Sequence, residues 1–249
     1  MQKKNRVYYR GLLILFFAFS FFRGEAQISY QLHKSRNETS WFVSAHVGMT
    51  SYLGDIARYG SDPIYKFKEE SKIAYGLFIG KSFNQKFSGR LYFNIGGLKA
   101  YNNELSIRYD ASMMAFGLQF MVNFYTLIAK MDYVPDFYIY GIAGAGSILT
   151  KPVLYHINSD SLDNTPIDEL NYAEKINSFE INGGLGVNMT ILRNFDAFAE
   201  LVYHYTMTDE LDLTVDEKND KYFQTLIGIR YRFAFAGNKG SSAFSRKRR

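Results

Sequence analysis

The chain contains no cysteine, and this absence excludes several classes of protein. Without thiols there is no disulfide framework, no cysteine nucleophile, no Cys-ligated zinc and no lipidated cysteine of a lipoprotein. Only four histidines are present, and they are scattered along the sequence, which argues against a metal centre. We therefore expect neither a metal ion nor an organic cofactor.

Proline and long apolar runs are also scarce. The 249 residues include only 4 Pro, and beyond residue 26 no apolar run approaches the roughly 18 residues of a transmembrane helix. By contrast, Phe, Tyr and Trp make up 17% of the chain, and 20 residues are Gly. This combination is typical of transmembrane β-strands, in which alternation dilutes the hydrophobic signal.

The N-terminus has the form of a secretory signal peptide. Four basic residues among the first ten precede the apolar run 11–22, and Gly24 and Ala26 supply the small residues that a signal peptidase reads. As a helix this run would span roughly 18 Å, against about 30 Å of hydrocarbon, so a membrane anchor is disfavoured. We expect a signal peptide over 1–26, followed by a periplasmic segment over 27–40.

The basic charge of the chain lies at its two ends. Of the net charge of +5, residues 1–26 hold +4 and residues 236–249 hold +5, which leaves −4 for the residues between them. The pI near 9.1 is therefore no footprint of nucleic-acid binding, and we expect no nucleic-acid partner. The Gly/Ser/Lys/Arg-rich segment 236–249 is expected to be a disordered basic tail.

Eight segments alternate between apolar residues and small or polar residues, as β-strands do when their two faces meet different surroundings. Phe78, Phe198 and Val202 break the alternation. The expected strands are 41–50, 74–80, 88–97, 114–123, 137–149, 179–191, 197–204 and 223–235. This pattern predicts an all-β antiparallel barrel of eight strands over residues 41–235.

Long and short links largely alternate between these segments. The long links are 54–71, 98–108, 150–177 and 206–221, the short ones are 84–86 and 192–194, and 126–136 fits least well. Such alternation is expected of a transmembrane barrel that has extracellular loops on one rim and short periplasmic turns on the other. Both ends of the barrel would then lie on the periplasmic side.

A soluble barrel would alternate as well, but with its apolar set inside and its polar set in water. Here the second set is mostly Gly, Ala, Ser, Asn and Gln, whereas soluble surfaces carry many more Lys and Glu. Small residues suit the interior of a narrow barrel, in which eight strands leave room only for side chains. We therefore expect the apolar set to face lipid, in a bacterial outer membrane.

The inward set includes a few charged and titratable residues. They are Arg90, Glu180, Glu200, Arg230, Arg232, His46 and His204. Because an unpaired buried charge costs several kcal/mol, we expect a lumen network of ion pairs and hydrogen bonds. Glu200 and Arg230, on neighbouring strands, are a candidate pair.

The same histidines and glutamates could instead form an acid–base group. No serine or second histidine at the loop rim completes a catalytic set around them. The network is therefore the favoured interpretation, and we assign no catalytic residue. The glycine runs 141–146 and 183–186 invite a nucleotide-binding interpretation, but both lie within strands, where no helix N-terminus could receive a phosphate.

Two expected loops are rich in acidic residues. Segments 158–174 and 209–220 carry carboxylates and amides of the kind that bind divalent cations. Neither has the spacing or the central glycine of a calcium loop, so solvated loops are favoured and ion binding stays open.

The chain resembles the small OmpA-like outer-membrane barrels in three features: the export signal, the eight alternating strands and the closing strand Gly228-x-x-Tyr231-x-Phe233. That strand is similar to the signal read by the barrel-assembly machinery, which implies this machinery and outer-membrane lipid as partners. The sequence departs from the signal in two ways: Leu226 stands where a polar residue is preferred, and 16 residues follow Phe233.

The corner Tyr52-Leu53-Gly54-Asp55 resembles the PorG-like barrels associated with type IX secretion. This resemblance implies a structural anchor or interaction protein, with periplasmic secretion-complex proteins as partners. The alternative is a small outer-membrane enzyme or adhesin that acts through its extracellular loops. An open pore is disfavoured, because eight strands leave a plugged interior.

Overall fold

The computed structural model describes residues 40–53, 70–102, 107–128, 135–156, 165–166, 175–192, 194–208 and 219–233. The strands and the helix there are β1 Trp41–Tyr52, β2 Ser71–Ser82, β3 Phe87–Asn102, β4 Ile107–Asn123, α4 Phe124–Ile128, β5 Phe137–His156, β6 Thr165–Pro166, β7 Ile176–Leu192, β8 Phe195–Thr206 and β9 Lys221–Phe233.

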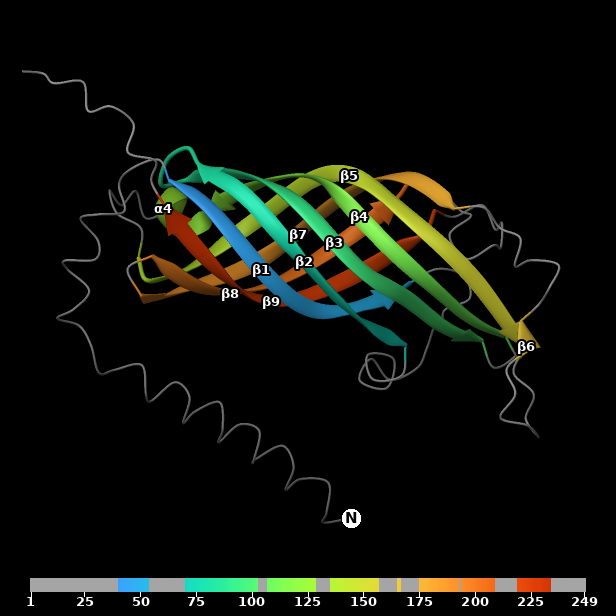
Figure 1. The fold of residues 1–249 in the computed structure, drawn as a ribbon. Helices are drawn as coiled ribbons and strands as arrows, with labels where there is room; N and C mark the ends of the chain where they lie inside the picture. The colour runs from blue at the N-terminus through green and yellow to red at the C-terminus, as the bar shows by residue number, and fades with distance from the viewer. Residues whose placement is uncertain are drawn as a thin grey trace, which may run out of the picture.

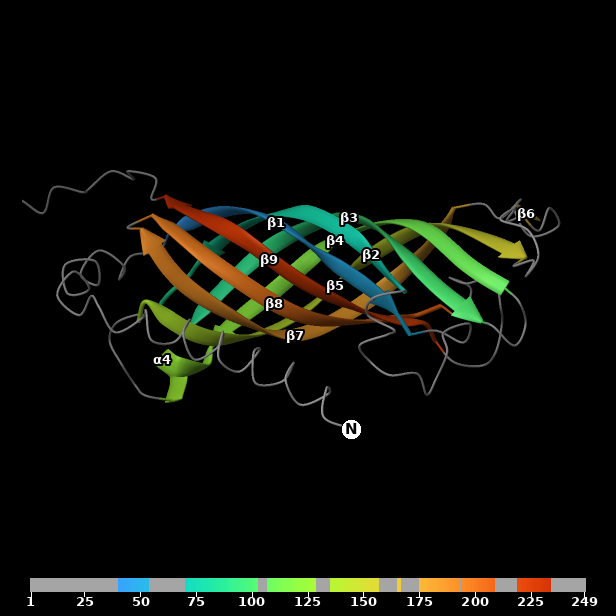
Figure 2. The ribbon, with the colours of Figure 1, turned by 90° about the horizontal axis from the view of Figure 1, so that it is seen from below.

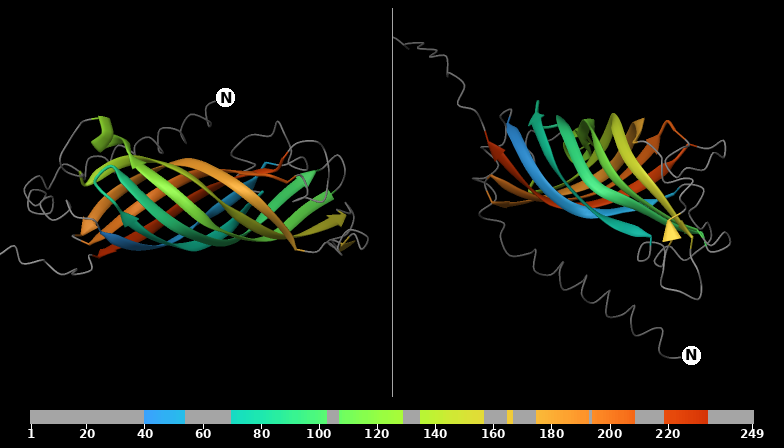
Figure 3. Two further views of the ribbon diagram at one scale, coloured as in Figure 1. Left: turned by 90° about the horizontal axis from the view of Figure 1, so that it is seen from above. Right: turned by 45° about the vertical axis from the view of Figure 1, so that its right-hand side comes forward.

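The eight long strands form a closed antiparallel barrel. Each pairs with its neighbours in the ring β1-β2-β3-β4-β5-β7-β8-β9, and β9 closes the ring by pairing with β1. The two residues of β6 add to the end of β5. Figures 1 and 3 show the strands tilted around one axis. This architecture confirms the eight-stranded barrel predicted from the sequence.

The two ends of the barrel differ, and we name them by their connections. The turn end holds the β2–β3, β4–β5 and β7–β8 connections, together with the start of β1 and the end of β9. The opposite end is the loop end. At the turn end, the Asn84 side chain accepts hydrogen bonds from the amides of Lys86 and Phe87, each at 2.8 Å. This local turn allows β2 and β3 to be joined within a few residues.

The strands reach further at the loop end than the sequence pattern predicted. Strands β3 and β4 pair without interruption from Phe87↔Val122 to Asn102↔Ile107, so the link expected over 98–108 shrinks to residues 103–106. Likewise, β5 runs to His156, and β7 begins at Ile176. The alternation persists there, with Leu98 and Tyr109 buried inside, but Lys99 and Asp110 interrupt its apolar face.

A short helix occupies part of the link expected over 126–136. The Asn123 side chain caps α4 by accepting from the amides of Tyr125 and Thr126 at 3.0 and 3.3 Å. Four of its five side chains, Phe124, Tyr125, Leu127 and Ile128, are exposed. The helix projects sideways from the turn end (Figure 2), where such residues suit a membrane interface. No helix among the described residues is long and apolar enough to cross a membrane.

The outer face of the barrel is apolar. Its exposed side chains include Leu77, Ile79, Leu91, Leu118, Leu185, Leu201, Ile227 and Ile229. The inner set is buried and holds most of the polar groups, as the alternation predicted. Soluble monomers rarely expose a continuous apolar surface, so this is the inside-out arrangement of a transmembrane barrel of the bacterial outer membrane.

Several predicted segments lie outside the described residues: the signal peptide, the periplasmic segment before Ser40, the strand end at Phe235 and the basic tail. The acidic stretch 209–218 does too, as does most of 158–174. Those expectations stay predictions.

Candidate functional site in the barrel lumen

Large aromatic side chains enter the lumen opposite glycines. The directly paired positions are Phe42↔Gly80, Tyr92↔Gly117, Tyr140↔Gly186 and Phe198↔Gly228. At each of these glycines, an added Cβ atom would overlap the facing ring. The expectation of a lumen filled by small residues was therefore wrong in part. Here the glycines make room for rings, which explains why Phe198 broke the alternation.

An ion pair crosses the centre of the lumen. The Arg90 guanidinium donates two hydrogen bonds to the Glu200 carboxylate, at 2.6 and 2.7 Å. Both side chains are fully buried. The Tyr140 hydroxyl also donates to Glu200 at 2.6 Å, and the Phe78 ring lies 3.7 Å from the Arg90 Cζ atom. A bidentate pair held on several sides is the geometry in which a buried ion pair is stable.

Two amides continue the network along the lumen. Arg90 Nε donates to the Gln119 side-chain oxygen at 2.8 Å, and Gln119 donates to Asn182 at 2.9 Å. Asn182 in turn donates to the Tyr92 hydroxyl at 3.1 Å. The ion pair is thus connected to the cluster around Glu180 through an unbroken chain of hydrogen bonds.

Glu180 is held by three donors. The hydroxyls of Tyr92 and Tyr222 donate to its two carboxylate oxygens, each at 2.6 Å. His204 Nδ1 lies 3.1 Å from the same carboxylate, and its ring stacks on Tyr222 at a centroid distance of 4.3 Å. Hydrogen bonds to a charged acceptor offset much of the cost of burying it.

His46 belongs to a separate branch of the network. Its Nε2 atom lies 2.9 Å from the Asn94 side-chain oxygen, and Asn94 donates to Gln224 at 2.9 Å. The imidazole stacks on Phe78 at 4.1 Å. His46 and His204 are therefore not brought together as an acid–base group, and both are enclosed by the barrel wall.

The arginines of β9 differ from the sequence-based expectation. Glu200 binds Arg90, and no ion pair joins it to Arg230 among the described residues. Arg232 donates to Asp196 at 2.9 Å instead. The expected pairing failed because Leu226, not Arg230, lies opposite Glu200 in the β8–β9 ladder, a register that cannot be read from alternation alone.

The residues of the closing-strand motif lie on both faces of β9. Gly228 faces inward against His46 and Phe198, where a side chain would not fit. Tyr231 faces outward, with its ring centroid 4.9 Å from that of Phe195 and 6.1 Å from that of Phe233. These rings form an aromatic patch at the turn end, as an interfacial girdle requires.

Sequence analysis found most of the charged members of the network but missed Asp196, which binds Arg232, and the neutral members. Tyr92, Tyr140, Tyr222, Gln119 and Asn182 supply most of the hydrogen bonds that join the charges. Their inward parity was the available signal. Their partners lie up to 90 residues away in the sequence, as with Tyr92 and Asn182, and only the closed ring brings them together.

Chemically, the described part of the lumen is a buried polar core. In the part of the chain that the structure describes, no group of three or more His, Cys, Asp or Glu side chains is arranged to hold a metal ion. The buried carboxylates of Glu180 and Glu200 are bound by arginine, tyrosine and histidine donors and are 0% and 3% exposed. The arrangement can hold the barrel shut.

No family model matches the chain, and no curated protein matches it in sequence. Among solved structures, Neisserial surface protein A is similar at a TM-score of 0.45 and 15% identity, with 79% of this chain and 99% of that chain covered. Ail of Yersinia pestis, in complex with the heparin analogue sucrose octasulfate, has a TM-score of 0.44 and 16% identity, with 79% and 99% covered. OprG of Pseudomonas aeruginosa has a TM-score of 0.43 and 13% identity, with 82% of this chain and 100% of that chain covered. Similarity at this level concerns the fold alone.

Proposed function

We propose that the chain is a non-conducting anchor in the outer membrane, which holds partner proteins through the parts that leave the membrane. The observation that carries this proposal is the ion pair between Arg90 and Glu200, which spans the lumen and is connected to Glu180. A lumen filled by buried charges and rings leaves no path for a solute. The barrel then acts through the loops, turns and tail at its two ends, which partner proteins can bind.

A narrower form of the proposal is a place in a type IX-like secretion assembly. Its support is the corner that begins at Tyr52 and the expected basic tail. Tyr52 is fully buried at the loop end, where its hydroxyl donates to Asp220, so this half of the corner also has a structural role. None of the three neighbours named above is named as a secretion component, so they add no support.

Two measurements test the anchor. In planar bilayers, the refolded protein should show no stable channel, because the lumen network blocks it. Partner retention should be measured on detergent-solubilised membranes with the chain truncated after Phe235, and separately with residues 158–174 shortened. Loss of partners on truncation, stronger at high salt, supports a periplasmic anchor, because exposed charges are screened. Stable conductance by the wild-type protein would refute it.

A second candidate function is adhesion through the loop end, and one observation favours it. Lys99 Nζ lies 4.7 Å from the centre of the Tyr101 ring, and Arg108 lies between Tyr101 and Tyr155 at 5.8 and 5.5 Å. Lys151 is exposed on β5, where it faces Ser112 of β4. Basic groups interleaved with aromatic rings suit a polyanionic surface. If Lys99→Gln and Lys151→Gln abolish cell attachment while truncation after Phe235 changes nothing, the adhesin takes precedence.

A further inference from the structure

Arg230 is a buried cation that forms no direct ion pair with a described residue, although the carboxylates of Asp196 and Glu200 lie near enough to interact with its charge. Its side chain is 3% exposed, and its Nη1 atom donates to the Asn188 side-chain oxygen at 3.3 Å. Its Nε and Nη2 atoms have no hydrogen-bond partner among the described residues. Because arginine has five N–H donors and stays charged, this position calls for an acceptor.

The acidic side chains near Arg230 bind other groups. Asp196 lies directly opposite Arg230 in the β8–β9 ladder, but its Oδ1 atom accepts from Arg232 at 2.9 Å and from Thr190 at 3.0 Å. Glu200 is occupied by Arg90 and Tyr140, as described above. Neither carboxylate forms an ion pair with Arg230.

Aromatic rings surround the Arg230 guanidinium. Its Cζ atom lies 4.7 Å from the centre of the Phe42 ring and 5.3 Å from that of Phe198. Rings attract a cation through their faces, but an N–H···π contact is a weaker interaction than a hydrogen bond to oxygen. These rings position the guanidinium, and its Nε and Nη2 donors still need an acceptor at the turn end.

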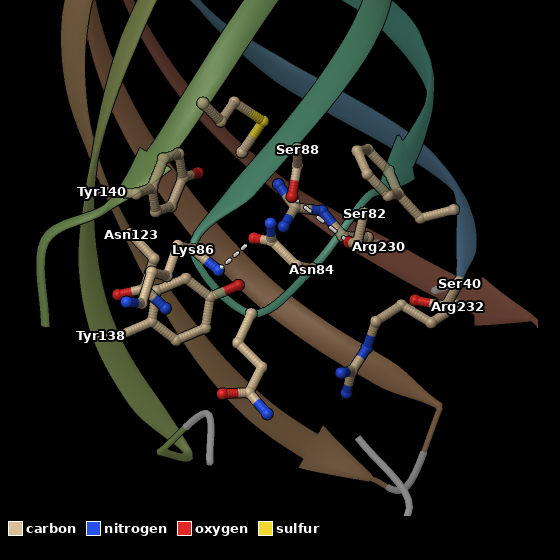
Figure 4. A pocket seen from close by; sticks show the side chains of 13 residues that line it. Ser40, Ser82, Asn84, Lys86, Ser88, Asn123, Tyr138, Tyr140, Arg230 and Arg232 are labelled. Atoms are coloured by element: carbon tan, nitrogen blue, oxygen red, sulfur yellow. Dashed lines mark hydrogen bonds between the residues drawn. The ribbon is translucent and has the colours of Figure 1, made fainter. Parts of the chain in front are cut away.

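A cavity of about 50 Å³ lies at that edge. Arg230, Arg232 and Lys86 line it together with the hydroxyls of Ser40, Ser82 and Ser88, and none of its described lining residues is acidic. Figure 4 shows Arg230 beside Ser88 and Asn84, with Arg232 and Tyr138 on different sides of the cavity. Three basic side chains, three serines and two tyrosines thus line a space the size of one small group.

We propose that this cavity binds a small oxyanion, meaning one carboxylate or phosphate group, either free or at the end of a larger molecule. The planar edge of an arginine matches two oxygens of such a group, and Lys86 adds a second positive charge. The proposal is independent of the anchor function, because it concerns only the turn end of the lumen.

Isothermal titration of the full chain, refolded in non-ionic detergent, tests the proposal. The probes are inorganic phosphate, acetate and glycerol phosphate, at an ionic strength held constant with sodium chloride. We expect saturable binding of one equivalent, several-fold weaker in Lys86→Gln and Ser88→Ala and lost in Arg230→Gln. The matched control is Lys81→Gln, which removes one positive charge at the same end from a side chain that lies over Trp41 and not in the cavity.

The source of the group follows from the probes. Equal binding of phosphate and glycerol phosphate identifies a terminal group, and binding of phosphate and acetate alone identifies a free ion. Should Arg230→Gln fail to fold, Lys86→Gln and Ser88→Ala still decide. The absence of saturable heat with all three probes, or equal losses in Lys86→Gln and Lys81→Gln, would mean that water alone solvates Arg230 and would overturn the proposal.

Discussion

Arg90 and Glu200 join opposite walls of the barrel. They lie on β3 and β8, four strands apart in the ring of eight, and their side chains meet through two hydrogen bonds of 2.6 and 2.7 Å. No element of local structure positions one relative to the other, so the pair forms only when the ring closes. It is therefore a direct probe of closure.

We expect strong coupling between Arg90 and Glu200. Arg90→Met or Glu200→Gln alone should reduce the free energy of unfolding by about 3–5 kcal/mol, because each leaves a buried partner unpaired. The double variant should lose much less than the sum of the two. Urea titration of the heat-modifiable folded band, measured in detergent, gives the coupling energy.

The control for this cycle pairs Glu200→Gln with Arg230→Gln. These residues share no hydrogen bond, so their effects should be closer to additive than those of the first pair. Coupling of the first pair below about 0.5 kcal/mol, the usual scatter of independent sites, would show that the ion pair does not exist as described.

The glycine–ring pairs predict a position-specific effect of one methyl group. Gly186→Ala should destabilise the barrel by about 1–3 kcal/mol, because the new Cβ atom overlaps the Tyr140 ring. Gly183→Ala, on the same strand, should be neutral, since its Cβ atom would have only the Ile142 carbonyl at 3.7 Å. Unfolding midpoints of the two variants test this, and equal midpoints would contradict the packing.

The apolar outer face predicts a dependence on depth. Leu185→Arg and Ile227→Arg place a charge on side chains that are 58% and 59% exposed to lipid, at about 2–4 kcal/mol each near the midplane. Met207→Arg makes the same change at 56% exposure but just beyond the end of β8, where about 0–1 kcal/mol is expected. The folded fraction in native membranes should fall only for the first two, and equal folding of all three would refute the orientation.

The Glu180 cluster predicts that a single hydroxyl matters. Tyr222→Phe removes a 2.6 Å hydrogen bond to a buried carboxylate and should cost about 1.5–3 kcal/mol of unfolding free energy. Tyr203→Phe, on the lipid-facing side of β8, removes the same atom and should change little. Equilibrium unfolding of the two variants distinguishes them, and a neutral Tyr222→Phe would mean that solvent reaches Glu180.

Local sequence patterns determine much of this barrel. Alternation between apolar and small residues placed the eight long strands, and it assigned Arg90, Glu180 and Glu200 to the interior, because a period of two needs only neighbouring residues. Alternating link lengths placed both ends of the barrel at the turn end. Where the alternation weakened, as at Lys99 and Asp110, the predicted strands stopped too early.

Register and closure were decided only by the tertiary structure. Which residues face each other across the lumen depends on the stagger of all eight strands, and no local pattern encodes that quantity. For this reason Glu200 was expected beside Arg230 and was found with Arg90, and the small residues expected in the lumen include glycines that accommodate rings such as Tyr140. The sequence determined which residues face the lumen. The closed ring decided which of them form hydrogen bonds and ion pairs with one another, and why Nε and Nη2 of Arg230 have no partner among the described residues.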